Sequence, residues 1–379
     1  MNTYFMTGNV KSIVYALQPL EKCSKFLGFV VSPSYSNNAT NKRLKLFNVL
    51  FLTLIMFLNF THLLFCDKFL DSVDAVTNSL FLLISNTGIC QYFFIATYYR
   101  KRIFRIVDNL IFIDSNIKTT MKLNQNYARS RTRLLFLLTV VFSSIFLNIC
   151  IDVAIFGSQS NLNMFDYQCG YFTFTSEILC GLFTCFILFV VDLITSRLIC
   201  VHNFIRYAKT EHVSPKAFVS TVNIFNCLRF VGKETSVIFQ VLVLYKIATF
   251  NVVILITAFW FTSTNHIGRI VPQNVMYASI YWILIYLRDI LATLYKFTSF
   301  DRKAKKTVQL MEDLEQAVGK SNLPYKQVEL FSLQVYVEDF KFSVFGCFPL
   351  DWTLLHSMVA GVATYLVIFH QFSNMEKKT

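Results

Sequence analysis

Apolar residues along this chain gather into seven long stretches that alternate with polar segments. The stretches lie near 44–66, 76–98, 134–156, 172–195, 240–262, 275–295 and 352–372. Each stretch is long enough to cross a hydrocarbon core of about 30 Å as a helix, which takes about 20 residues. The pattern therefore predicts an all-α membrane protein with seven transmembrane helices.

Basic residues are distributed unevenly between the connecting segments. Most of the 35 Lys and Arg residues lie before the first stretch, after the second, after the fourth and after the sixth. The other loops and the C-terminal tail hold Lys68, Arg269, Lys377 and Lys378. Because cytoplasmic loops carry the excess of Lys and Arg in membrane proteins, we expect a cytoplasmic N-terminus and an extracellular C-terminus. This orientation is the reverse of that of a G-protein-coupled receptor.

Two basic segments on the predicted cytoplasmic side continue the helical pattern of the spans. Segment 99–133 carries an apolar stripe at helical spacing. The stripe consists of Ile103, Ile106, Val107, Leu110 and Ile113. Segment 196–239 has the same helical character, interrupted at Pro215. We therefore expect the second helix to extend into the cytoplasm and the segment after the fourth span to be helical as well.

After the sixth span, the sequence predicts an amphipathic helix over 296–318. Its apolar stripe consists of Phe297, Phe300, Ala304, Val308, Met311, Leu314 and Val318. A second helix is predicted over 325–345, before Gly346 and Pro349 break the chain ahead of the seventh span. Such stripes are too apolar to remain single in water, so we expect residues 296–350 to form a packed cytoplasmic anchor layer. Association of these helices with the lipid surface is the alternative.

Composition agrees with a membrane protein and narrows the function classes. Hydrophobic residues make up 55% of the chain and charged residues 15%, whereas a soluble chain needs more polar surface. The formal net charge of +13 fits cations that face anionic lipid headgroups, and it does not require a nucleic-acid partner. The sequence has no metal-site spacing and no nucleotide or hydrolase motif. We therefore expect no enzyme activity, no metal and no cofactor.

Ionisable residues inside a span cost about 2.5–3.5 kcal/mol at a helix centre, so each one needs an explanation. Glu177 lies near the outer end of the fourth span, where it faces a ligand cavity or meets a donor on another helix. Asp192 and Arg197 lie near the inner end of this helix and are expected to serve packing or helix interfaces. Arg288 and Asp289 are neighbours in the sixth span, and they are not expected to pair because they point to different sides of the helix.

These polar positions allow the hypothesis of a small-molecule pocket in the outer half of the bundle, within residues 44–295. Such a pocket would combine a few polar groups with aromatic side chains. The candidate residues are Tyr92, Phe174, Glu177, Trp260 and Tyr281. Hydrogen bonding between helices is the alternative explanation for polar positions inside spans.

The seventh span carries a short motif near its end. The sequence there is Thr364-Tyr365-Leu366-Val367-Ile368-Phe369-His370-Gln371-Phe372. Thr-Tyr, five mostly apolar residues and Gln-Phe resembles the C-terminal signature of insect gustatory receptors, and the layout of seven spans is similar to that family. His370 departs from the pattern because its position is normally apolar, and we interpret it as a hydrogen-bonding group at the outer interface.

The resemblance implies a ligand-gated, poorly selective cation channel in the plasma membrane of a chemosensory neuron dendrite. It implies a tetramer, either of identical chains or with related subunits, in which residues 351–372 line a central pore. Residues 1–43 would then be cytoplasmic and residues 373–379 extracellular. The pore or gate residues implied by the resemblance are Thr364, Tyr365, Ile368, Gln371 and Phe372.

Helical geometry is compatible with such a pore face. At about 100° per residue, Thr364, Ile368 and Gln371 share one side of the helix. Gln371 and Phe372, near the outer end, are the leading gate candidates. Packing of this stripe against a neighbouring helix is the alternative. Asp351 is expected to cap the start of the helix.

Bitter plant compounds are the expected ligands, because they are sensed by the larger and more varied class within the family. Many sweet-sensing members carry an acidic residue directly after Thr-Tyr, where this chain has Leu366; a fructose-type or other sugar receptor remains the alternative. A metabotropic seven-helix receptor or a membrane transporter is the alternative from another class. The inverted charge pattern and the absence of Asp-Arg-Tyr and Asn-Pro-x-x-Tyr motifs argue against the metabotropic receptor.

Overall fold

The computed structural model contains helices at most of the predicted positions. The described residues are 13–26, 46, 49, 50, 53, 54, 56, 57, 61, 72–157, 164–210, 215–267, 273–318 and 342–376. The helices are α1 (Ile13–Phe26), α3 (Ser72–Tyr98), α4 (Arg100–Met121), α5 (Tyr127–Gly157), α6 (Met164–Thr210), α7 (Pro215–Ile267), α8 (Gln273–Val318) and α10 (Trp352–Glu376). Strands β1 (Ser343–Val344) and β2 (Phe348–Pro349) pair antiparallel. The first predicted span, 44–66, lies largely outside the described residues.

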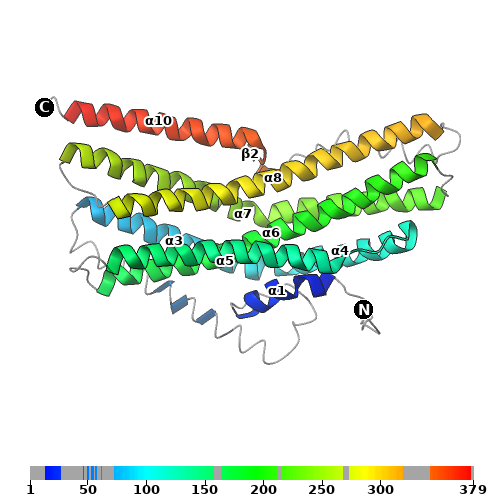
Figure 1. Ribbon diagram of the computed structural model, residues 1–379, viewed down its shortest axis with the longest axis horizontal. Helices are drawn as coiled ribbons and strands as arrows, with labels where there is room; N and C mark the ends of the chain where they lie inside the picture. The colour runs from blue at the N-terminus through cyan, green and yellow to red at the C-terminus, as the bar shows by residue number, and fades with distance from the viewer. Residues whose placement is uncertain are drawn as a thin grey trace.

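The helices run side by side along the molecule (Figure 1). Helices α6, α7 and α8 contain 47, 53 and 46 residues, which makes each about 70–80 Å long at 1.5 Å per residue. A membrane core accounts for only about 30 Å of that length. These helices therefore continue well beyond a membrane, as the periodicity of the inner segments predicted. Helices α3 and α10 lie along one half of the bundle, and α4 lies along the other (Figure 1).

Among the residues whose side chains are described, three helical stretches are long and apolar enough to cross a membrane. They are Tyr127–Ile151, Phe174–Ala208 and Lys216–Ala258. A shorter apolar helix covers Trp352–Ile368. These four stretches overlap the third, fourth, fifth and seventh predicted spans, and the second and sixth predicted spans fall within α3 and α8.

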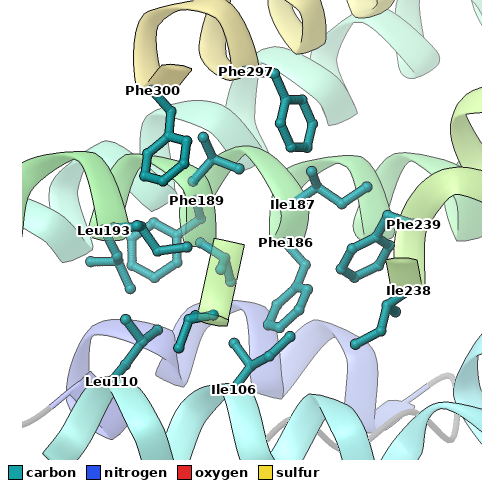
Figure 2. Close-up of a cluster of buried hydrophobic side chains, with 14 of the residues drawn as sticks. Ile106, Leu110, Phe186, Ile187, Phe189, Leu193, Ile238, Phe239, Phe297 and Phe300 are labelled. Atoms are coloured by element: carbon teal, nitrogen blue, oxygen red, sulfur yellow. The ribbon is translucent and has the colours of Figure 1, made fainter. Parts of the chain in front are cut away.

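Helix α6 lies at the centre of the bundle. It packs against α3, α5, α7 and α8, and every side chain from Phe174 to Leu198 is buried or half-buried. Figure 2 shows Phe186 and Phe189 of α6 among apolar side chains of α4, α7 and α8. The rings of Phe186 and Phe239 lie 5.7 Å apart. A helix that is apolar on every side is stable where other helices surround it, which explains why this stretch has no polar face.

The apolar stripes predicted outside the spans are buried. In α4, the buried residues include Ile103, Ile106, Val107, Leu110 and Ile113. In α8, Phe297, Phe300, Ala304, Met311 and Leu314 are buried and Val308 is half-buried, while the side chain of Val318 is outside the described part. Helix α4 packs against α6 and α7, and α8 packs against both as well. Helices α4 and α8 thus bury their stripes while packing against the same two helices, α6 and α7.

A buried ion pair joins α4 to α6. Arg197, which is 1% exposed, donates from Nε to Oδ1 of Asp114 at 2.9 Å and from Nη2 to Oδ2 at 2.8 Å. The Tyr127 hydroxyl of α5 donates to the same carboxylate at 2.8 Å. The expectation that Arg197 serves packing between helices is confirmed, with a partner that the sequence did not indicate.

The second predicted inner helix, 325–345, is wrong at its C-terminal end. Residues 325–341 lie outside the described residues, but Phe342 leads into the β1–β2 hairpin. Gly346 in the turn has a φ of +75°, a left-handed conformation that glycine adopts without steric strain. Gly346 and Pro349 favour a tight turn over a helix. Residues 343–345, which were predicted as the end of the helix, belong to the hairpin instead.

Gly88 marks a close approach of α3 to α6 and α7. A Cβ added at Gly88 would lie 2.1 Å from Oγ of Ser176 and 2.7 Å from Oη of Tyr245. A Cβ added at Gly361 would meet nothing within 4 Å, so Gly361→Ala is a matched control with the same gain in helix propensity. We expect Gly88→Ala to be less stable than Gly361→Ala by about 1–3 kcal/mol because of overpacking. The difference is measured by heating each variant and then quantifying the folded fraction by fluorescence-detected gel filtration. Equal stability of the two variants would contradict the packing explanation.

Candidate ligand pocket and pore helix

Aromatic rings and one carboxylate meet between α6 and α8. The ring centroids of Phe174 and Trp282 lie 6.5 Å apart, and those of Trp282 and Tyr286 lie 5.8 Å apart, both pairs being stacked. The Tyr286 hydroxyl donates to Oε1 of buried Glu177 at 2.5 Å. We call these four residues the α6–α8 cluster. Apolar walls with few polar groups are typical of small-molecule sites, and Glu177 also has the interhelical donor that the sequence analysis named as its alternative.

Three further charged side chains lie beside this cluster. Nζ of Lys246 pairs with Oδ2 of Asp289, while Arg288 donates to Oδ1 of Asp289 from Nη2 at 2.7 Å and from Nε at 3.0 Å. The prediction that Arg288 and Asp289 do not pair is therefore wrong, because the long guanidinium side chain folds back onto its neighbour. Glu177 lies within electrostatic range of all three. Two basic groups thus lie beside two carboxyl groups, which reduces the cost of keeping these polar groups inside the bundle.

Tyr92 and Tyr281, two other predicted pocket residues, lie at different helix interfaces. Tyr92 is buried where α3 meets α6, with its ring centroid 5.1 Å from that of Phe183. Tyr281 is half-buried and donates to the backbone oxygen of Ser144 on α5 at 3.3 Å. Trp260 lies in α7, and its side chain is outside the described part. The predicted set is therefore spread over several interfaces, and only Phe174 and Glu177 belong to the α6–α8 cluster.

Sequence analysis missed three residues of this region, Lys246, Trp282 and Tyr286. Lys246 lies six residues inside a predicted span, and the cost of an ammonium group at that depth calls for a nearby partner. Trp282, Tyr286 and Asp289 follow one another at spacings of four and three residues, which places them on one face of α8. Aromatic and ionisable residues on one face of a membrane helix could have indicated a polar site at this helix interface.

Helix α10 begins at the cap that the sequence predicted. Oδ1 of Asp351 accepts hydrogen bonds from the backbone nitrogen of Thr353 at 2.8 Å and from its hydroxyl at 2.5 Å. Leu354 and Met358, in the first two turns, are buried, and α10 packs against α7.

The β1–β2 hairpin fastens this end of α10 to the rest of the bundle. The ring of Phe342 lies 4.9 Å from that of Phe297 and 5.4 Å from that of Phe300 on α8. The backbone nitrogen of Phe345 donates to Oε1 of Gln240 on α7 at 3.1 Å. The start of α10 is therefore attached to both α7 and α8.

The residues predicted to form the pore lie on the other half of α10. Every side chain from Ala363 to Ile368 is exposed in the protomer. This stretch includes the predicted residues Thr364, Tyr365 and Ile368. Gln371 is exposed as well, and the side chain of Phe372 is outside the described part. The described part of the chain thus leaves this surface of α10 uncovered.

Nearly the whole chain matches one known family. Residues 17–376 match the family described as 7tm chemosensory receptor. The chain belongs to this family. This chemosensory receptor therefore has the seven-helix membrane architecture that its hydrophobic pattern predicted, and the family is one of receptors and not of enzymes.

Solved structures of an insect receptor share the fold of this chemosensory receptor. The insect olfactory receptor OR5 from Machilis hrabei superposes with a TM-score of 0.69 at 11% identity, over 94% of this chain and 97% of that chain. The same receptor in complex with eugenol gives a TM-score of 0.63 at 12% identity, again over 94% and 97%. No curated relative matches the chain by sequence. At such low identity the likeness shows the fold alone, which is that of an insect olfactory receptor.

Proposed function

We propose that this chemosensory receptor is a gustatory receptor, a tastant-gated, non-selective cation channel in the plasma membrane of chemosensory dendrites. The match of residues 17–376 to the 7tm chemosensory receptor family carries the proposal. The Thr-Tyr and Gln-Phe pairs near the end of α10 favour taste over smell. The proposed tastants are bitter plant compounds, with a sugar as the alternative.

The receptor assembles as a tetramer, of identical chains or with related subunits, with its N-terminus inside the cell and its C-terminus outside. The uncovered surface of α10 supports this assembly, since apolar side chains from 363 to 368 are exposed in one protomer. A face with Thr364, Ile368 and Gln371 is apolar enough to close a pore by dewetting and polar enough to fill with water when widened. Helix α10 is thus the proposed pore helix, with Gln371 and Phe372 at its gate.

The α6–α8 cluster is the proposed core of the ligand pocket. Its stacked rings offer flat apolar contacts, and the carboxylate of Glu177 offers an acceptor for a hydroxyl or an amine of the tastant. Tyr92, Trp260 and Tyr281 belong to the proposed pocket on the strength of the sequence. A relative by fold has been observed in complex with eugenol, which supports a small organic ligand.

Tyr286→Phe is expected to raise the half-activating tastant concentration by about tenfold. The substitution keeps the ring but removes the hydrogen bond that holds the Glu177 carboxyl group in the proposed pocket. A tenfold shift corresponds to about 1.4 kcal/mol, which is within the range for one hydrogen bond. Concentration–response curves of whole-cell current measure the shift. Tyr295→Phe is the matched control, because Tyr295 lies on the same helix but is 62% exposed. Equal curves for Tyr286→Phe and Tyr295→Phe would exclude this hydrogen bond from ligand recognition.

Whole-cell recording from cells that express only this chain tests the proposed function. A panel of alkaloids, glycosides and sugars should evoke a cation current that persists when G-protein signalling is blocked. A current that requires G proteins would favour the metabotropic alternative, and a response to sugars alone would favour the sugar receptor. A C-terminal tag should be labelled on intact cells, and a tag that is protected would overturn the proposed orientation.

A further inference from the structure

Two cations pair with one carboxylate where α5, α6 and α8 meet, and a third lies nearby. Asp192 of α6 accepts from Nη1 of Arg133 at 2.9 Å and from Nζ of Lys296 at 2.7 Å. Lys303, two turns further along α8, lies within electrostatic range of all three. We call these four residues the cation cluster. Three positive charges and one carboxylate leave the cluster with an excess of two positive charges.

The cation cluster lies at the boundary between apolar spans and basic segments. Arg133 directly precedes the third predicted span, Asp192 lies near the end of the fourth, and Lys296 directly follows the sixth. These three ends, far apart in the sequence, meet in one group of ion pairs. The depth of the cluster is therefore that of lipid headgroups.

Apolar side chains border the cations on the surface of the protomer. The side chains of Arg133 and Lys296 are 50% and 29% exposed. Phe136, one turn along α5 from Arg133, is 67% exposed, and Tyr295, next to Lys296, is 62% exposed. A phospholipid fits such a surface, with its phosphate on the cations and an acyl chain on the neighbouring rings.

Lys303 is the least neutralised member of the cation cluster. Among the described residues, no carboxylate lies within ion-pair distance of Lys303. Partial desolvation lowers the pKa of Lys303, and the positive charges of Lys296 and Arg133 add to this effect against the attraction of Asp192. A bound anion would relieve the repulsion between these like charges.

We propose that the cation cluster binds a phosphoinositide, an anionic phospholipid whose headgroup carries a phosphomonoester. A phosphomonoester has a charge of about −1.5 to −2 near neutral pH, which matches the excess charge of the cluster. Basic pockets between transmembrane helices on the cytoplasmic side are known sites for such headgroups. The choice of a cytoplasmic-leaflet lipid rests on the proposed orientation of the receptor. A bound phosphate would join α5 to α8 through Arg133 and Lys303.

Binding of a fluorescent short-chain phosphatidylinositol bisphosphate to the purified full-length receptor in detergent tests the proposal. Lys303→Gln should weaken binding about fivefold, and Lys303→Gln combined with Arg133→Gln about 25-fold. Lys305→Gln is the matched control, because Lys305 lies on the same helix but pairs with Asp301 at 3.0 Å, outside the cluster. Lys305→Gln should bind like the unmodified receptor, and gel filtration confirms that each variant is folded.

Equal affinities of the Lys303→Gln and Lys305→Gln variants would overturn the proposal. Equally tight binding of short-chain phosphatidylserine would exclude a phosphomonoester site, and equally tight binding of soluble inositol trisphosphate would exclude a lipid ligand. If the cluster variants lost self-association and the unmodified receptor bound no lipid, the cluster would be a contact between receptor copies instead. No current is recorded in this assay, so its outcome is independent of whether the receptor is a channel.

Discussion

Asp114→Ala is expected to lower the free energy of unfolding by about 3–5 kcal/mol. The substitution removes the carboxylate that receives two hydrogen bonds from Arg197 and leaves a guanidinium that is 1% exposed without its counter-ion. The hydroxyl of Tyr127 loses its acceptor at the same time. A lower midpoint of thermal unfolding and a smaller monodisperse peak in fluorescence-detected gel filtration measure the loss.

The double variant Asp114→Leu with Arg197→Leu separates the effect of a stranded charge from the effect of lost packing. Replacement of both partners of a buried ion pair by apolar residues is often neutral or stabilising, so the double variant should be more stable than Asp114→Ala. Tyr127→Phe removes one hydrogen bond and should cost only about 1.5–3 kcal/mol. If Asp114→Ala were no less stable than the double variant, an unpaired Arg197 would not be the cause.

Gln371→Ala is expected to shift the half-activating tastant concentration about tenfold to higher values without reducing delivery to the cell surface. Gln371 is exposed on α10, and its amide is the outermost polar group of the proposed pore face. Loss of the amide makes the constriction more apolar and favours its dewetted, closed state. An energy difference of about 1.4 kcal/mol between closed and open states is enough for a tenfold shift. Concentration–response currents and surface biotinylation of the same cells measure both quantities.

Leu366→Ala is the control for the gate. Leu366 is also exposed, but it lies on the side of α10 away from Gln371 at about 100° per residue. Leu366→Ala should leave the concentration–response curve in place. Unchanged currents in Gln371→Ala would remove Gln371 from the gate, whereas equal shifts in both variants would point to a general weakening of α10.

Local signals predicted a large part of the fold. The stripe that includes Ile103 and Leu110 is buried in α4, and Asp351 caps α10. Both predictions depend on residues within a few helical turns of one another, where backbone geometry alone fixes which side chains share a face. The seven-helix membrane architecture followed in the same way from the length of the apolar stretches.

Partners from distant parts of the chain could not be predicted in this way. Periodicity shows that one face of a helix is buried but not which helix covers it, so the pairing of Arg197 with Asp114 was missed. Helix α1 was missed although Ile13, Leu17 and Leu20 lie at helical spacing and are buried, because its stripe is short and covers only one side. In the candidate pocket, Phe174 and Glu177 were among the residues named from the sequence, but their α8 partners depend on how three long helices align.

The hairpin fixes α10 at one end only among the described residues. Its base is fixed to α7 and α8 through Phe342 and Phe345, whereas the side chains from Ala363 to Ile368 and that of Gln371 are exposed. Because Gln371 lies about 30 Å from the base, a tilt of only about 5° there would sweep the tip sideways by about 2.5 Å, close to the width of a water molecule. In the proposed tetramer, the difference between a dewetted and a water-filled pore would then require no kink and no unwinding of α10.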